Sequence, residues 1–376
     1  MCTQIYERHI MTTDSRIDRI EKFREEIREE KGLDGVLIST DENRRYLSGF
    51  TGSSGFLLVT PKDAVLATDF RYVEQAGRQA PDFRVERITG GTAWLPVMVS
   101  DLGIKRLGFE GHNVTVAAHF AMQKAFEDAD NPERPELVST TGMVEKLRAV
   151  KNEEELALLQ KAVDIADQAF ERVAPTIEPG VTEQEVAWEL EKAMRELGAE
   201  SVAFDIIVGA GPNGALPHHR ADETVIKNGD AVVIDMGARY LGYCSDLTRT
   251  LVVGEPDEIF TRVYETVLTA QLSAEESLRS GMTGEEADAI AREIIEKAGY
   301  SENFGHSLGH GVGLEVHEHP RVGQRSGDPL TDGMVFSVEP GIYLSGWGGV
   351  RIEDMVVLEN GRARVMSGAH KSPRAK

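Results

Sequence analysis

The chain contains little cysteine and no long hydrophobic segment. Only Cys2 and Cys244 occur among 376 residues, which excludes a disulfide framework and a zinc site built from cysteine ligands. No apolar run approaches the roughly 20 residues that a membrane-spanning helix needs. The start of the chain holds no apolar stretch suited to a signal peptide, so we expect a cytoplasmic protein.

Basic residues are scarce relative to acidic ones. Asp and Glu number 63 against 41 Lys and Arg, which gives a formal net charge of −22. A field this negative repels nucleic acid and anionic membranes, so we expect neither as a partner. The acidic excess suits a high-salt habitat, in which salt screens surface repulsion, or an ordinary acidic cytosolic protein.

The length and the 41% apolar content predict two folded domains. Residues 1–14 are expected to be a flexible N-terminus, with Met11 as an alternative start. A small α/β domain is expected over residues 15–140. Its predicted elements are helices at 15–31, near 70–80 and at 115–127, and strands at 35–40, 55–60 and 64–69.

A polar stretch containing Pro132 and Pro135 predicts a domain boundary at about 130–145. A long amphipathic helix from Lys151 to Arg172 is expected to open a second domain, which spans residues 145–370.

The second domain repeats part of its own sequence. Residues 180–198 parallel residues 281–299, with an offset of 101. Each copy has a threonine N-cap and a glutamate three residues later, which together form a capping box. The paired residues are Thr182 and Thr283, and Glu185 and Glu286. A Gly- and His-rich stretch and a strand ending in a carboxylate follow each copy, which predicts two similar halves with a site on their axis.

Each half places two carboxylates on a predicted hairpin. Asp235 and Asp246 are equidistant from a turn near Tyr240–Leu241, so they are expected to face each other within about 5.5 Å. Glu339 and Glu353 are likewise symmetric about Gly346.

Four converging carboxylates repel one another and are costly to desolvate. Lysine or arginine could neutralise one or two of them, whereas two divalent cations would neutralise all four. Oxygen-rich ligands with limited imidazole suit Mn²⁺, Co²⁺ or Zn²⁺.

Six of the ten histidines lie in the two Gly-rich stretches: His218, His219, His306, His310, His317 and His319. His306 and His310 are four residues apart, as in helical zinc sites. Closely spaced glycines around them exclude a helix, so extended or turn structure is expected there. The cluster of histidines beside the carboxylates indicates a functional site.

The sequence resembles the metallopeptidase group that contains Xaa-Pro aminopeptidase, Xaa-Pro dipeptidase (prolidase) and creatinase. The motifs that carry the resemblance are ALPHH (215–219), the DLTRT run from Asp246, GHGVGLEVHE (309–318), VEPGIY (338–343) and VRIED (350–354). The resemblance implies a creatinase-type α/β N-terminal domain followed by a pseudo-twofold "pita-bread" metallopeptidase domain.

The resemblance also implies the metal ligands. They fall on Asp235, Asp246, His310, Glu339 and Glu353, of which Asp246 and Glu353 would bridge two divalent ions. Mn²⁺ is the first candidate, with Co²⁺ or Zn²⁺ as alternatives.

Further residues are assigned by the same resemblance. Glu339 would accept a proton from the attacking water, His218 and His317 would contact the substrate, and His306 would line the pocket. Arg351 lies two residues before Glu353 and Thr248 two after Asp246, so each is expected on the ligand face of its strand as a support for the ligands.

The implied activity is hydrolysis of Xaa-Pro bonds in dipeptides or at the N-terminus of peptides, by an enzyme that relatives suggest is a homodimer. Dipeptidase and aminopeptidase activity both remain open. The alternatives are an aminopeptidase with other specificity and a catalytically silent scaffold.

Overall fold

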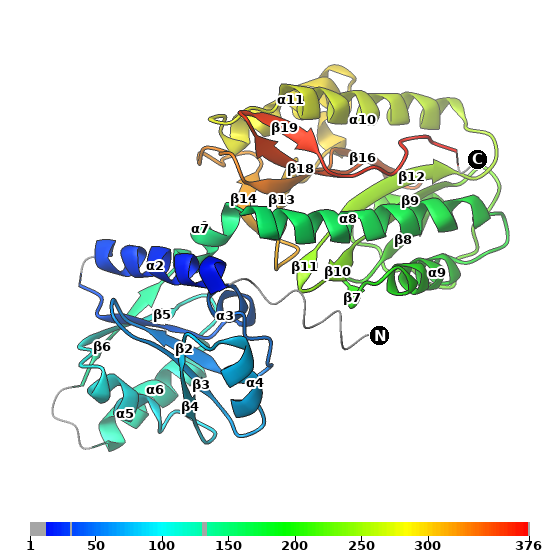
Figure 1. Cartoon of the computed structure of the whole chain (residues 1–376). Helices are drawn as coiled ribbons and strands as arrows, with labels where there is room; N and C mark the ends of the chain where they lie inside the picture. The colour runs from blue at the N-terminus through cyan, green and yellow to red at the C-terminus, as the bar shows by residue number, and fades with distance from the viewer. Residues whose placement is uncertain (1–12, 31, 130–133, 375–376) are drawn as a thin grey trace. The chain divides into compact units, whose positions relative to one another are not determined.

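The computed structural model describes residues 13–30, 32–129 and 134–374 (Figure 1). The chain divides into two compact units, Met1–Arg148 and Ala149–Lys376. The prediction of a flexible N-terminus concerns residues 1–14. Residues 1–12, including Met11, lie outside the described residues, and the first described helix begins at Thr13.

The division between the units lies beyond the boundary expected from polar composition. Strand β6 (Glu136–Thr140) pairs in parallel with β5 (Arg106–Glu110), so it belongs to the first unit although its residues are mostly polar. Its partly exposed position at the edge of the sheet explains that polarity.

In the described part of the first unit, six strands form one mixed sheet in the order β4-β3-β2-β1-β5-β6. Strand β1 runs antiparallel to β2 but parallel to β5. The predicted helices and strands are confirmed as α2, α4, α6, β1, β2 and β3. The remaining bounds are α2 (Thr13–Glu29), β1 (Gly35–Ile38), α3 (Asp41–Ser48), β2 (Phe56–Val59), β3 (Ala64–Thr68), α4 (Val73–Gln79), β4 (Arg84–Arg87), α5 (Leu95–Asp101), α6 (Val116–Asp128) and α7 (Met143–Ala149).

Within residues 149–374, the second unit combines four long helices with short antiparallel sheets, and its first helix confirms the predicted amphipathic helix. The first half contains α8 (Glu153–Val173), η1 (Ala174–Thr176), α9 (Glu183–Glu196), β7 (Ser201–Val202), β8 (Ile207–Ala210), η2 (Gly211–Ala215), β9 (Ala231–Met236), β10 (Ala238–Tyr240), β11 (Tyr243–Cys244) and β12 (Leu247–Val252). The second contains α10 (Glu258–Ser277), α11 (Gly284–Lys297), η3 (Ser301–Asn303), β13 (Gly309–Gly311), β14 (Glu318–Val322), β15 (Val335–Val338), β16 (Gly341–Leu344), β17 (Gly348–Arg351), β18 (Asp354–Glu359) and β19 (Arg362–Val365).

The predicted duplication is present in the structure. Helices α9 and α11 both have 14 residues and begin with complete capping boxes, formed by Thr182 with Glu185 and by Thr283 with Glu286. In each half, two helices cover the strands: α8 and α9 pack on β8, β9 and β12, and α10 and α11 pack on β14, β15 and β18.

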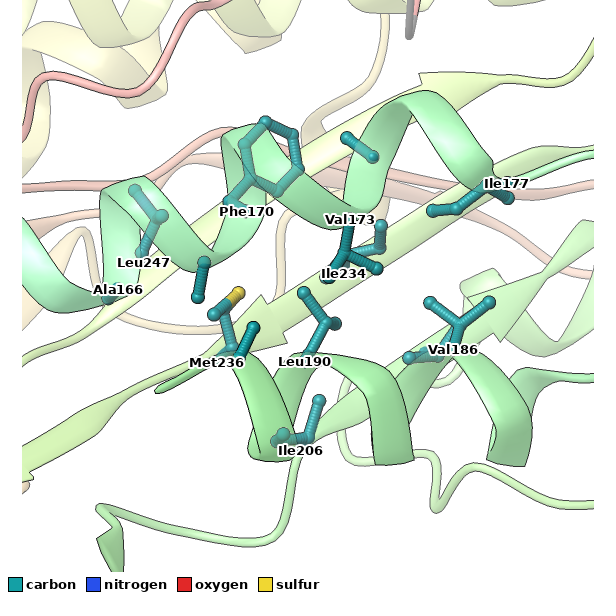
Figure 2. Packing of buried hydrophobic residues seen from close by; sticks show 14 of the residues in the cluster. Ala166, Phe170, Val173, Ile177, Val186, Leu190, Ile206, Ile234, Met236 and Leu247 are labelled. Atoms are coloured by element: carbon teal, nitrogen blue, oxygen red, sulfur yellow. The ribbon is translucent and has the colours of Figure 1, made fainter. Parts of the chain in front are cut away.

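The core of the first half shows how the helices are held on the sheet (Figure 2). Leu190 of α9 extends toward Ile234 on β9, and Phe170 and Val173 of α8 and Met236 of β9 belong to the same buried cluster. This apolar layer fixes the strand that carries Asp235. None of the described helices is both long enough and apolar enough to cross a membrane.

Candidate metal centre

The first hairpin differs from the prediction in its register. Its turn lies at Leu241–Gly242, where both residues have positive φ angles of 45° and 83°, as a two-residue type I′ turn requires. Asp235 therefore pairs with Thr248, and the expected pairing of Asp235 with Asp246 is wrong by two residues. The reason is Gly242, which adopts a left-handed conformation without strain and so moves the turn one residue along the chain.

The second hairpin has the predicted register. Val338 pairs with Asp354 and Gly341 pairs with Arg351, so Glu339 and Glu353 occupy facing positions between these pairs. Gly346 lies at the centre of the turn with a φ of 79°. The prediction that the two glutamates are symmetric about this glycine is confirmed.

A contact between Thr248 and Glu353 joins the two halves of the second unit. The Glu353 amide donates to the Thr248 carbonyl at 3.0 Å, and the Thr248 hydroxyl donates to Glu353 Oε2 at 2.6 Å. Next to this junction, Asp246, His310 and Glu353 each offer one ligand atom, and these three atoms lie within 4.8 Å of one another.

His310 lies on β13, not on a helix, as predicted. Its position depends on Gly309, because a Cβ there would lie 1.9 Å from the Ser337 carbonyl oxygen. The Nδ1 atom of His310 lies 3.1 Å from the Gly311 carbonyl oxygen, which assigns the proton to Nδ1 and leaves a lone pair on Nε2. That Nε2 atom is 3.3 Å from Glu339 Oε1.

Burial lowers the pKa of His310 to about 4, so the imidazole is neutral near pH 7. Burial also raises the pKa of Glu339 to about 8. Burial and repulsion by neighbouring carboxylates raise the pKa values of Asp246 and Glu353 well above their usual range.

Arg351 is the buried cation beside these carboxylates. Its Nη2 donates to Asp235 Oδ2 at 2.6 Å, and its Nε donates to the Thr248 hydroxyl at 3.1 Å. Thr248 thus contacts Glu353, Arg351 and the strand of Asp235. The side-chain hydrogen bonds of Thr248 thus go to Glu353 and Arg351 of the other hairpin.

The donor set fits a bound cation. Asp235 Oδ1 is buried and has no hydrogen-bond partner among the described residues, although buried oxygens are normally paired. The neutral Nε2 of His310 faces a carboxylate oxygen, and two acceptors at this distance need a proton or a cation between them. Carboxylates and one imidazole are suitable ligands for divalent metal ions.

Tyr343 is a residue of this network to which sequence reasoning assigned no role. Arg351 Nη1 donates to the Tyr343 oxygen at 2.9 Å, and the same oxygen lies 2.9 Å from His306 Nε2. The His306 Nδ1 atom lies 2.8 Å from the Ser307 carbonyl, so the tyrosine hydroxyl donates to Nε2. Its place in the VEPGIY motif was the available signal, but its partners lie on other strands or loops.

We expect Tyr343→Phe to lower the free energy of unfolding by about 1–3 kcal/mol, because it leaves buried polar atoms of Arg351 and His306 unpaired. Urea denaturation measures this. Tyr240→Phe is the matched control, with an expected change of about 0.5 kcal/mol or less, since no hydrogen bond of the Tyr240 hydroxyl occurs among the described residues. Equal losses in the two variants would contradict the bridging role of Tyr343.

His218 and His317 lie at the exposed rim of the site. The rings of His310 and His317 are 4.2 Å apart between centroids. Burial and the nearby His218 lower the pKa of His317, and burial lowers the pKa of His306 to about 4. His218 is thus a neighbour of His306 and His317, which place it on the histidine side of the site.

A second acidic and histidine cluster, Glu183 with His219 and Asp222, already has protein partners. Glu183 accepts hydrogen bonds from the Ala210 amide and the Asn213 side chain on one oxygen, and the other lies 2.6 Å from His219 Nε2. This cluster therefore anchors the loop that carries His218.

Comparison with known proteins identifies relatives of the whole chain. Residues 157–360 match metallopeptidase family M24, and residues 19–150 match the creatinase/prolidase N-terminal domain. The sequence is 40% identical to an Xaa-Pro dipeptidase of Pyrococcus horikoshii, over 90% of this chain and 94% of that protein.

Solved structures give the same result. An Xaa-Pro dipeptidase from Bacillus anthracis superimposes with a TM-score of 0.91 at 44% identity, covering 96% of this chain and 99% of that one. An X-Pro aminopeptidase from Thermotoga maritima has a TM-score of 0.83 at 40% identity, covering 91% and 97%. These matches confirm the expected creatinase-type domain and pita-bread domain, and the chain belongs to metallopeptidase family M24.

Proposed function

We propose that this protein hydrolyses the peptide bond before proline, in Xaa-Pro dipeptides or at the N-terminus of longer peptides. The observation that carries the proposal is a buried group of acceptors with too few donors: Asp246, Glu339 and Glu353 lie around the neutral His310, and Asp235, paired with Arg351, has one oxygen without a hydrogen-bond partner among the described residues. The names of the similar proteins, an Xaa-Pro dipeptidase and an X-Pro aminopeptidase, support the choice of substrate.

In this proposal the ligands of two divalent ions are Asp235, Asp246, His310, Glu339 and Glu353. Asp246 and Glu353 would serve both ions, Asp235 would serve one, and His310 and Glu339 would serve the other. Two such ions supply four positive charges to four carboxylates, and the oxygen-rich ligand set favours Mn²⁺ over Co²⁺ or Zn²⁺.

The residues would hold ions whose chemistry, when bound, would be to lower the pKa of a water molecule and to polarise the scissile carbonyl. Glu339 accepts a proton from the attacking water, and the proline nitrogen takes up a proton as the bond breaks. His218 and His317, at the rim, contact the substrate and stabilise the charge that develops on its carbonyl oxygen. His306 lines the pocket and is held by Tyr343.

An Xaa-Pro bond needs a specialised site. Its nitrogen carries no hydrogen and its φ angle is locked by the ring, so a substrate cannot be held through that amide as an ordinary extended peptide is. The ring must instead be recognised by a shaped pocket next to the reacting bond.

Substrate assays on metal-free protein supplemented with Mn²⁺, Co²⁺ or Zn²⁺ test this function. We expect cleavage of Xaa-Pro dipeptides to exceed cleavage of the matched Xaa-Ala dipeptides by on the order of 100-fold or more, since a site shaped for the ring gains little from alanine. Cleavage of Xaa-Pro dipeptides should stop when a chelator removes the metal and resume when metal is added back.

Chain length of the substrate separates the two activities. Hydrolysis of dipeptides alone identifies a dipeptidase, and cleavage of Xaa-Pro-Yaa tripeptides identifies an aminopeptidase. Absence of both from metal-loaded protein would contradict the proposal and favour a silent scaffold.

We further propose that the enzyme is a cytoplasmic homodimer. The family resemblance supports the dimer, and the acidic composition and the absence of membrane-spanning helices among the described residues are compatible with the location. Peptides are then its only expected partners besides a second copy of the chain.

A further inference from the structure

Arg249 is a fully buried arginine one residue after Thr248, on strand β12. All five of its N–H groups have acceptors. Nη1 donates to the carbonyls of Thr248 and Glu353 at 3.0 and 2.6 Å, and Nη2 donates to Asp354 Oδ1 and to the Ala369 carbonyl, both at 2.7 Å. Nε donates to the His370 carbonyl at 3.0 Å. Arg249 therefore links both hairpins to the end of the chain.

The main chain at Glu353 and Asp354 is fixed by hydrogen bonds from several elements. Its carbonyl accepts from Arg249, while the Glu353 amide and side chain contact Thr248. The next residue, Asp354, is buried and receives Lys371 Nζ and Gln271 Nε2 on its second oxygen, at 2.5 and 3.0 Å. Lys371 also pairs with Glu275 of α10 at 2.9 Å.

Residues 366–374, here called the C-terminal segment, are fastened to several elements and pass β12 and α10 (red in Figure 1). The Met366 amide donates to the Met355 carbonyl at 2.8 Å, and the Gly368 amide donates to Asp167 on α8 at 2.6 Å. The Tyr264 hydroxyl on α10 donates to the Lys371 carbonyl at 3.1 Å. The segment thus presents Lys371 and two backbone carbonyls to the Arg249–Asp354 pair from a fixed position.

Buried ion pairs of this kind add little net stability compared with apolar packing, but they fix the orientation of the groups that they join. A guanidinium that uses all its donors fixes the planes of its partners, which a lysine at the same place does not. Here the fixed partner is the main chain of Glu353, a ligand in the proposed function.

We propose that Arg249 and Lys371 are positioning residues that set the placement of Glu353, so that the C-terminal segment is part of the scaffold of the metal centre. This inference rests on the proposed function, in which Glu353 is a metal ligand. Neither residue touches substrate. Their expected effect is on metal affinity and on kcat, with KM little changed.

Calorimetric titration of the full-length metal-free protein with Mn²⁺ tests this. We expect Arg249→Lys, which keeps the charge opposite Asp354 but loses the planar fork, to weaken Mn²⁺ binding by about 10–100-fold. Lys371→Met, in which Arg249 still pairs with Asp354, should weaken it by about 3–10-fold. The electron paramagnetic resonance signal of an exchange-coupled Mn²⁺ pair should change in both.

Two control variants separate positioning from general stability. Arg374→Met removes an exposed ion pair with Glu255 from the same segment, and Tyr264→Phe removes another hydrogen bond to Lys371. Both should keep Mn²⁺ affinity within about 2-fold of the parent, although Tyr264→Phe lowers the melting temperature, since neither change reaches Asp354.

The outcomes are distinct. If the Mn²⁺ affinity and the spectra are unchanged in Lys371→Met, and also in a folded Arg249→Lys protein, the positioning role is overturned. This holds even if the protein cleaves Xaa-Pro peptides. Loss of Mn²⁺ affinity in these variants of a protein that cleaves no Xaa-Pro peptide would uphold it and overturn the proposed activity. A parent protein that binds no divalent ion would overturn both.

Discussion

Glu339→Gln is expected to lower kcat by about 10²–10⁴-fold or more, the range associated with loss of a general base. The amide cannot accept the proton of the attacking water and is a poorer metal ligand than a carboxylate. The fold should survive, because glutamine has the same shape and can still accept the hydrogen bond that the Ser337 hydroxyl donates to Glu339 Oε1. Initial rates on an Xaa-Pro dipeptide at saturating Mn²⁺ measure the effect.

Glu302→Gln is the matched control, because Glu302 is an exposed glutamate of the same unit. It should retain the parent kcat. Circular dichroism and the melting temperature verify that Glu339→Gln is folded. A folded Glu339→Gln protein with near-normal turnover would refute the proton-accepting role of Glu339.

The second large effect concerns the stability of the metal-free protein as a function of pH. Burial raises the pKa of Glu339 from 4.5 to about 8, and the pKa values of Asp246 and Glu353 are raised as well. Between pH 4.5 and about 8 these carboxyls therefore bind more protons in the folded protein than in the unfolded chain. Their contribution to the free energy of unfolding falls as the pH rises through this window, by about 1.4 kcal/mol per unit of raised pKa.

Bound metal should remove this dependence, because divalent cations replace the protons that the carboxylates otherwise need. We therefore expect the metal-free protein to lose on the order of several kcal/mol between pH 5 and pH 8 relative to the Mn²⁺-loaded protein. Urea unfolding in chelator and in excess Mn²⁺ at each pH gives the difference.

Other buried carboxyls do not obscure this result. Burial raises the pKa of Asp167 to about 6 and that of Glu275 to about 8. These two carboxyls lower the free energy of unfolding as the pH rises in both the metal-free and the Mn²⁺-loaded protein. Their contribution therefore cancels when one curve of unfolding free energy against pH is subtracted from the other. Parallel curves for metal-free and Mn²⁺-loaded protein would show that the carboxylates of the site are not coupled to a metal.

Local signals in the sequence were sufficient for much of the fold. The capping boxes at Thr182 and Thr283 are formed within four residues, so their recurrence located α9 and α11 correctly. The second hairpin was also predictable, because Gly346 lies at its centre and leaves one register for Glu339 and Glu353. In the first hairpin, the symmetry of Asp235 and Asp246 predicts a turn at Tyr240–Leu241, but Gly242 tolerates a positive φ most easily, so the predicted register is wrong by two residues.

The amino-acid sequence by itself determined the two-part organisation, the duplication and the kinds of side chain that meet in the site, because these follow from short-range periodicity and from motifs. The partners of those side chains were decided only in the tertiary structure. Arg351 reaches Asp235 across 116 positions of sequence, and Arg249 reaches Asp354 across 105. Such contacts depend on how the two halves pack and on the sheet register, and no local pattern encodes either.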